Sequence, residues 1–355
     1  MPSERVTLQE LVENGHLDTV PDDYLVSEQD RVKFEDYSCD ARELPVIDMV
    51  GVEGERRDLV VQQIRSVCEE WGFFQVKNHG VSLPLMKRMQ QEIREFFDLP
   101  YEEKNKIRAR FDGHVLPDEG YSDRFGLKEG SANWSDRLRL YTLPASSRRY
   151  ELWPKHSPSF RETLEEYCEE QDKLMSRISE LISEGLGLET SYLNDYFAGK
   201  YQQQLQVNYY PPCPQPDVTM GLRKHSDNNL LTLILQDSTP GLQVKKDGQW
   251  ITVKPMEDWF VVNVGDQIEI LSNGRYTSAE HRAFVSSKPR MSIATFSMPS
   301  NETVVGPILE LLGTEEQPKY RAISFSEFKD SFYYTGWATA PTGKGHLKHL
   351  LISQD

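Results

Sequence analysis

The stretch KHSDNNLLTLILQD, residues 224–237, joins a polar segment to a strongly apolar one. Its apolar part, residues 230–235, has the length and β-rich composition of a strand buried in a core. Its polar part holds His225 and Asp227, which are two residues apart and so share one face of an extended segment. The pair is either half of a metal site or a polar turn that leads into the strand, and taken alone it favours the turn.

The composition indicates a chain that can build a sizeable core and argues against polyanionic partners. Of its 355 residues, 38% are hydrophobic, and the formal net charge is −16. Nucleic acids and anionic membrane surfaces attract clustered Lys and Arg, so we expect neither as a partner. The four cysteines form no CxxC pair, and the N-terminal residues lack the apolar run of a signal peptide. We therefore expect a cytoplasmic protein.

The two halves of the chain differ in periodicity. Apolar residues recur at helical spacing in residues 55–71, 85–97 and 159–182. Later, short strands are predicted at residues 205–210, 230–235, 259–264, 267–271 and 291–296, and Asp247-Gly248 predicts a hairpin turn. Neither βαβ alternation nor a glycine-rich phosphate loop is present in the sequence. The pattern predicts a mainly β fold with flanking helices, an antiparallel sandwich or jelly roll.

This change of pattern divides the chain into three parts. Residues 1–200 are predicted to form an N-terminal helical region with the first strands, and residues 201–300 the β core. Residues 301–355 are predicted to form a C-terminal helical tail, with a helix around residues 325–332, that could serve as a lid.

His281 changes the interpretation of the pair at 225–227. It lies at another predicted strand edge of the β-rich half, where it could join His225 and Asp227. Two imidazoles and one carboxylate leave three coordination positions open, a set that is diagnostic of non-heme Fe(II) oxygenases.

A second constellation follows on the next predicted strand. Arg290 and Ser292 share a face, and a guanidinium beside a hydroxyl clamps a carboxylate well because it makes two parallel charge-assisted bonds. Asn208 and Tyr210 offer an amide and a hydroxyl in the same way before Pro211. Each residue alone has an ordinary interpretation as a surface ion pair or core packing, but their order and spacing together favour a site.

Longer phrases of the sequence point to one family. These are LPVIDM at 44–49, EEWGFFQVKNHGV at 69–81, VNYYPPCPQP at 207–216, HSD at 225–227, GDQIEILSNGRYTSAEHR at 265–282 and RMSIATF at 290–296. With them the chain resembles, over about residues 40–340, the plant Fe(II)/2-oxoglutarate-dependent dioxygenases that act on flavonoids and hormones. The resemblance includes the flavone synthase I, flavonol synthase and anthocyanidin synthase types.

The resemblance implies a fold, a metal and a co-substrate. The fold is a double-stranded β-helix, a distorted jelly roll framed by N-terminal helices. Fe(II) would be held by His225, Asp227 and His281, while Ser226, which replaces a more frequent Thr, would point away from the metal. The far carboxylate of 2-oxoglutarate would be bound by the set Arg290, Ser292, Tyr210 and Asn208.

The same resemblance implies the reaction and its partners. O2 would oxidise 2-oxoglutarate to succinate and CO2 while a small aromatic substrate is hydroxylated or desaturated, with ascorbate as activator. The family default is a monomer. Sequence departures weaken an assignment to anthocyanidin synthase, because Arg137 stands where an aromatic residue is expected and Gln206 where a Lys is expected.

Several residues are candidates for contact with the substrate. Phe296 shares a face with Arg290 and Ser292, so it could stack on an aromatic ring or pack in the core. Arg137 and Arg139 share a face as well, and would suit an acidic or polyphenolic substrate if that face lines the pocket rather than solvent. Further wall candidates are Tyr121, Gln206, Phe332, Tyr333 and Trp337.

Three functions remain open at this point. The first is oxidation of a flavonoid such as a flavanone or dihydroflavonol. The second is the same chemistry on a small acidic hormone, similar to salicylate, jasmonate or gibberellin, or on an alkaloid. The third is a jelly-roll binding protein without catalysis, which the presence of every ligand and clamp residue opposes.

Overall fold

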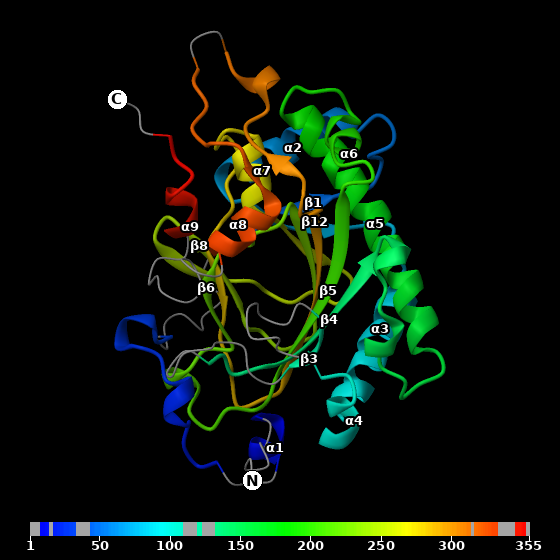
Figure 1. Ribbon diagram of the computed structural model, residues 1–355, viewed down its shortest axis with the longest axis vertical. Helices are drawn as coiled ribbons and strands as arrows, with labels where there is room; N and C mark the ends of the chain where they lie inside the picture. Colours follow the sequence, from blue (N-terminus) through cyan, green and yellow to red (C-terminus); the bar gives the residue numbers. More distant parts are fainter. Residues whose placement is uncertain are drawn as a thin grey trace.

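The computed structural model describes residues 8–13, 17–32, 43–108, 119–122, 132–313, 316–332 and 345–352. Its centre is a pair of β-sheets with helices on the outside (Figure 1). The predicted class, mainly β with flanking helices around a double-stranded β-helix, is confirmed. No helix in these ranges has both the length and the apolar character needed to cross a bilayer.

The larger sheet has eight strands taken from both halves of the chain. Their spatial order is β1 (Val46–Asp48), β2 (Phe73–Lys77), β10 (Phe260–Val264), β7 (Leu231–Gln236), β12 (Arg290–Pro299), β5 (Tyr201–Tyr210), β4 (Asp136–Leu143) and β3 (Gly120–Ser122). All neighbouring pairs are antiparallel except β1 with β2. Every residue of β7 is buried between β10 and β12, so the apolar part of the 224–237 stretch is the predicted core strand.

The smaller sheet carries the polar end of that stretch. It consists of β6 (Leu222–His225), β11 (His281–Ala283), β8 (Leu242–Lys246) and β9 (Gln249–Thr252), in that order. The β8–β9 hairpin turns at Asp247 and Gly248, whose φ angles of 50° and 79° are those of a type I′ turn. The predicted hairpin is thus confirmed.

Helices from the first half pack on the larger sheet. They are α2 (Arg57–Glu70), α3 (Leu83–Phe97) and α5 (Phe160–Gly185), with the short α4 (Tyr101–Asn105) and α6 (Tyr192–Tyr196) beside them. Their apolar faces form one core cluster with β2, β5, β7, β10 and β12, as the helical spacing predicts. Shorter helices, α1 (Leu8–Glu13), α7 (Asp266–Leu271), α8 (Phe325–Ser331) and α9 (Gly345–Lys348), lie at the edges.

One predicted strand is a helix. Residues 267–271 belong to α7, although their alternation favoured a strand. The reason is tertiary: the backbone N–H groups of Asp266 and Gln267 donate to the carbonyl oxygens of Asp227 and Asn229, and the carboxylate of Glu269 accepts from Ser278 N and Tyr320 Oη. Every residue of the segment is buried, so periodicity could not distinguish its two faces.

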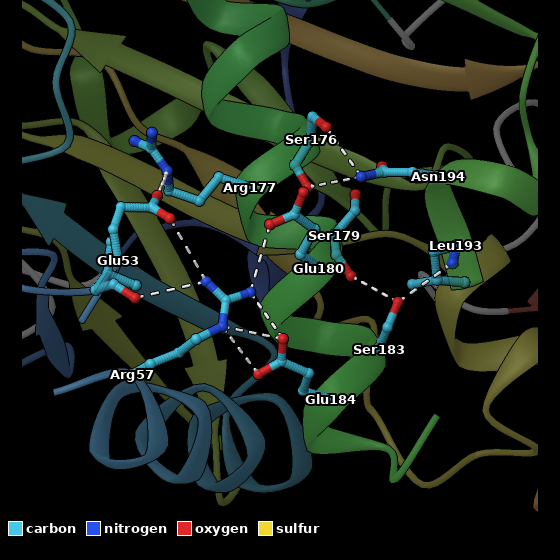
Figure 2. Close-up of polar contacts among 11 residues, drawn as sticks. Glu53, Arg57, Ser176, Arg177, Ser179, Glu180, Ser183, Glu184, Leu193 and Asn194 are labelled. Carbon is cyan, nitrogen blue, oxygen red and sulfur yellow. Dashed lines mark hydrogen bonds and ion pairs between the residues drawn. The ribbon is translucent and has the colours of Figure 1, made fainter. Parts of the chain in front are cut away.

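An ion-pair network joins the two helices that frame the sheet (Figure 2). The guanidinium of Arg57 on α2 donates to Glu184 on α5 through Nε at 3.0 Å and Nη2 at 2.7 Å, and lies 3.4 Å from Glu180. Arg57 also lies 3.8 Å from Glu53, which pairs with Arg177 of α5. Arg57 and Glu184 are only partly exposed, so their pair is less screened than a surface pair, whereas Glu53 is exposed.

We expect Arg57→Ala to lower the free energy of unfolding by about 1–2 kcal/mol, because a bidentate, partly buried pair is lost. Arg65→Ala on the same helix is the control and should cost much less, since Arg65 is exposed and its one ion pair among the described residues is with Glu69. Urea unfolding of both variants measures the difference. An equal loss of unfolding free energy in both variants would show that the ion-pair network does not stabilise the fold.

Candidate active site

The three predicted metal ligands meet between the two sheets. His225 ends β6 and His281 begins β11, and the two are direct partners in the antiparallel pair. Asp227 lies in the turn from β6 to β7, and its Oδ1 is 3.5 Å from His225 Nε2 and 3.6 Å from His281 Nε2. All three side chains are buried, and their ligand atoms lie within 4.8 Å of one another.

The backbone sets which nitrogen of each imidazole faces the centre. His225 Nδ1 lies 2.8 Å from the carbonyl oxygen of Arg223, and His281 Nδ1 lies 3.2 Å from that of Ala279. A carbonyl oxygen can only accept, so each Nδ1 carries the proton and donates it. The lone pair of each Nε2 is therefore directed to the centre, the usual arrangement for metal-binding histidines.

Asp227 is oriented by the larger sheet. Its Oδ2 accepts hydrogen bonds from Thr232 Oγ1 at 2.6 Å and Asn263 Nδ2 at 2.8 Å, which leaves Oδ1 toward the histidines. Burial alone would raise the pKa of this carboxyl, but His281, His225 and the Thr232 hydroxyl lower it well below its usual range. The carboxylate is thus charged throughout the neutral pH range.

The imidazole of His281 is uncharged at neutral pH. Burial, together with the neighbouring His225, lowers the pKa of His281 to about 4. A neutral imidazole has a free lone pair for a metal, whereas a protonated one has none. Two imidazole nitrogens and one carboxylate oxygen therefore fit Fe(II) and leave coordination positions open for other ligands.

Ser226 points away from this centre, as predicted. Its hydroxyl donates to Asp266 Oδ2 at 3.3 Å, and the same carboxylate oxygen lies 2.7 Å from His346 Nε2 of α9. His346 and Asp266 are completely buried. The rings of Phe328 and Phe332 pack against His346, with centroids 5.7 and 4.7 Å away. The turn that holds Ser226 and Asp227 is therefore connected through Asp266 and His346 to the C-terminal helices.

The second predicted constellation is also assembled. In the register of β12 with β5, Arg290 lies opposite Tyr210 and Ser292 opposite Asn208. The Arg290 side chain is buried, and its Cζ lies 5.0 Å from the Tyr210 ring centroid. A Cβ at Gly241 would come within 2.4 Å of Arg290 Cδ, so only glycine leaves room for this side chain.

Arg290 is a buried cation whose hydrogen-bonding capacity is only partly used. Nη2 donates to Gln236 Oε1 at 3.1 Å, while Nε and Nη1 have no hydrogen-bond partner among the described residues. The carboxylate of Asp237 interacts electrostatically with Arg290 but accepts no hydrogen bond from it among the described residues. Buried N–H groups without an acceptor are costly, so an anionic ligand would satisfy them. The carboxylate of a keto acid such as 2-oxoglutarate fits this requirement.

A pocket opens next to His225 and Asp227, and four strands and α8 contribute to it. It is lined by Arg137, Arg139, Tyr141, Gln202, Gln204, Gln206, Leu222, His225, Asp227, Asn228, Phe296, Met298, Phe325, Lys329 and Phe332. Its walls combine aromatic rings with three cationic side chains, and the only lining carboxylate among the described residues is Asp227. The pocket therefore favours a molecule with an apolar body and negative charge.

Most of the substrate candidates chosen from sequence line this pocket. Arg137, Arg139, Gln206, Phe296 and Phe332 all do. Tyr121 does not. Its ring packs against Phe96 and Phe97, and its hydroxyl donates to Asp136. Tyr333 and Trp337 lie outside the described residues.

Sequence reasoning missed several lining residues that simple spacing could have suggested. Met298 follows Phe296 by two on β12, and Gln204 precedes Gln206 by two on β5, so each shares a face with a chosen residue. Lys329 follows Phe325 by four on α8, which places both on one helix face. Asn263 carried no signal, because only the fold brings β10 to Asp227.

The sequence matches two family models. Residues 201–299 match the 2OG-Fe(II) oxygenase superfamily, and residues 44–157 match the non-haem dioxygenase N-terminal model named for morphine synthesis. Among curated proteins, the chain is 40% identical to jasmonate-induced oxygenase 4 of Arabidopsis thaliana, with 99% of each chain covered. It is 38% identical to flavanone 3-dioxygenase 2 of Oryza sativa subsp. japonica, over 94% of this chain and 96% of the relative.

A solved structure extends the similarity to three dimensions. The crystal structure of JOX2 in complex with 2OG, Fe and JA superimposes with a TM-score of 0.87 at 37% identity and covers 99% of both chains. The fold, the His-Asp-His cluster and these relatives agree on an enzyme that uses Fe(II) and 2-oxoglutarate on small molecules. The chain therefore belongs to the 2OG-Fe(II) oxygenase superfamily, among its plant dioxygenases.

Proposed function

We propose that this enzyme hydroxylates or desaturates a small carboxylic acid with an apolar body, of the jasmonate-like class. The observation that carries the proposal is the pocket beside His225 and Asp227. It holds Arg137, Arg139 and Lys329 together with a wall of Phe296, Phe325 and Phe332. Cations attract and orient a carboxylate, and the rings bury the hydrocarbon part.

The relatives support this class of substrate. Jasmonate-induced oxygenases 4 and 2 of Arabidopsis thaliana are 40% and 38% identical to the chain over nearly its whole length. The JOX2 structure was solved with JA in addition to 2OG and Fe. The cationic and aromatic lining of the pocket is compatible with a ligand of that class.

His225, Asp227 and His281 hold the metal in this proposal, and the clamp residues hold the co-substrate. When bound, Fe(II) with 2-oxoglutarate and O2 supplies the oxidising power, and succinate and CO2 leave. The Nε2 atoms bind the metal because each Nδ1 is tied to a carbonyl oxygen, and Asp227 offsets part of its charge. Arg290 orients the co-substrate through Nε and Nη1, with Ser292 on the same strand and Tyr210 and Asn208 on the facing strand β5.

The pocket residues orient the substrate. Lys329 and Arg139 bind the carboxylate at the pocket wall, so the apolar body extends toward His225 and Asp227. The Nε of Arg139 donates to Gln206 Oε1, and Gln206 Nε2 donates to Asn208 Oδ1 at 2.9 Å. This chain of side chains fixes the guanidinium before the acid arrives, which reduces the entropic cost of binding.

A flavonoid is the second candidate substrate. Phe296 lines the pocket on the same strand as the clamp, where it could stack on an aromatic ring. Flavanone 3-dioxygenase 2 of rice is 38% identical to the chain. The same turnover screen tests both candidates.

We expect turnover with Fe(II), ascorbate and 2-oxoglutarate to favour a jasmonate-like free acid over its methyl ester and over flavanones and dihydroflavonols. Product mass distinguishes hydroxylation, which adds one oxygen, from desaturation, which removes two hydrogens. Preferred turnover of a flavanone would overturn the acid assignment and support the second candidate.

Lys329→Gln supplies the matched test of charge within that screen. It should raise KM for the acid about tenfold, since one charge-assisted bond is lost, and leave KM for 2-oxoglutarate and for the methyl ester unchanged. An equal effect on acid and ester would mean that Lys329 acts by packing alone.

Arg290→Ala should raise KM for 2-oxoglutarate about thirtyfold, because a charge-assisted hydrogen bond to a buried guanidinium is worth about 2 kcal/mol. Fe(II) binding should be retained, since Arg290 is not a ligand of the metal cluster. Arg290→Lys keeps the positive charge but loses the two parallel N–H donors of the guanidinium. Its KM for 2-oxoglutarate should lie between those of the unchanged enzyme and of Arg290→Ala. An unchanged KM in the alanine variant would rule out the clamp.

Asp227→Ala should abolish turnover and weaken Fe(II) binding, measured by equilibrium dialysis under anaerobic conditions. The neighbouring Ser226→Ala is the control, because its hydroxyl faces Asp266 and should leave Fe(II) binding intact. Full activity of Asp227→Ala would mean that another carboxylate binds the metal.

A further inference from the structure

A second cluster of metal-binding side chains lies on the outer helical layer. It consists of Glu92 and Glu95 on α3 and His156 in the segment that leads into α5. One ligand atom from each lies within 4.8 Å of the others. The helices α3 and α5 run side by side there (Figure 1), and none of the three residues lines the pocket described above.

The imidazole of His156 is buried without a hydrogen-bond partner. Its side chain is only 6% exposed, and neither ring nitrogen has a partner in the described part of the chain. Glu92 Oε2 also has no hydrogen-bond partner in the described part of the chain, and the Glu92 side chain is only 10% exposed. This oxygen lies 3.6 Å from His156 Nε2. Buried polar atoms are nearly always paired, so Nε2 and the facing Oε2, both without a hydrogen-bond partner, call for a bound group between them.

The second oxygen of Glu92 is already committed. Oε1 accepts hydrogen bonds from Ser159 Oγ at 2.6 Å and Ser157 Oγ at 3.2 Å. These bonds orient the carboxylate and leave Oε2 toward His156. On Glu95, Oε1 accepts from Gln91 Nε2 at 2.7 Å. Outer hydrogen bonds of this kind are typical of the carboxylates that bind metals.

The charge at this point calls for a cation. Across the described ranges, neither Glu92 nor Glu95 forms an ion pair with a Lys or Arg. Glu95 also lies in the last turn of α3, where the partial negative charge of the helix end disfavours a carboxylate and favours a cation.

We propose that Glu92, Glu95 and His156 bind a divalent transition-metal ion, separate from the catalytic iron. One imidazole and two carboxylates are ligands that such ions accept. Two ligands about 2.1 Å from a tetrahedral zinc ion lie about 3.4 Å apart, close to the distance between His156 Nε2 and Glu92 Oε2. The ion would fasten α3 to the start of α5 and leave a position for water.

Zinc binding to the full chain tests the site. The substitutions His225→Ala and Asp227→Ala remove the catalytic centre, and equilibrium dialysis should then still find one Zn²⁺ per chain, with a Tm that rises as zinc is added. If that double variant unfolds without cooperativity, the intact chain is titrated instead and should bind two. No zinc beyond the catalytic site would overturn the proposal.

Single substitutions separate a built site from an adventitious one. His156→Gln and Glu92→Gln should each weaken this zinc site at least about tenfold, with a smaller loss for the exposed Glu95→Gln. His79→Gln is the matched control, because His79 is a buried histidine bonded to Asp258 O and Val81 N. It should leave zinc affinity unchanged.

Two further results decide the outcome. In the chain with an intact catalytic centre, His156→Gln should keep kcat and both KM values, since the site holds helices and takes no part in turnover. Zinc affinity that is equal in His156→Gln, Glu92→Gln and His79→Gln would show adventitious binding only and would overturn the proposal.

Discussion

The carboxylate of Asp227 is the point at which the two sheets are joined. One oxygen is held by Thr232 and Asn263 of the larger sheet, and the other faces two histidines of the smaller sheet. A buried charge is tolerated only when it is fully paired, so both sheets must be in place for this group to be stable. Asp227 thus couples the metal cluster to the packing of the two sheets, beside the apolar cluster that also joins them.

Arg290 imposes the complementary constraint. It is a buried cation whose neighbours include Gln236, the face of Tyr210 and the carboxylate of Asp237. Its Nε and Nη1 still lack an acceptor among the described residues, which costs free energy that an anionic co-substrate would offset. In the proposed site, the buried anion Asp227 in the turn before β7 serves the metal, and the buried cation Arg290 on β12 serves the co-substrate. Because Asp227 and Arg290 have different partners, the metal and the carboxylate of the co-substrate would bind at separate positions.

Local sequence spacing predicted the groups that lie close together along the chain. Arg290 and Ser292 share a face of β12 because a strand repeats every two residues, whereas Asp227 joins His225 from the turn that follows β6. The facing of Arg290 and Tyr210 depends on the β5–β12 register, which the sequence does not encode locally. Lys329 comes from a helix beyond the core, and Tyr121 is buried because β3 pairs at the sheet edge next to α3. Residues 267–271 became a helix through long-range hydrogen bonds that no short window contains.

The pocket is divided between two kinds of chain segment. The metal cluster and the clamp come from β5, β6, β11, β12 and the turn after β6, whereas α8 and its C-cap Phe332 contribute to neither group. From this helix, Phe325, Lys329 and Phe332 line the pocket. Substitutions on α8 can therefore change which molecule is held while the oxidising centre stays the same. A gene duplicate could acquire a new substrate through a few codons of this one helix, which makes α8 an evolvable part of the enzyme, as β4 is with its own lining residues.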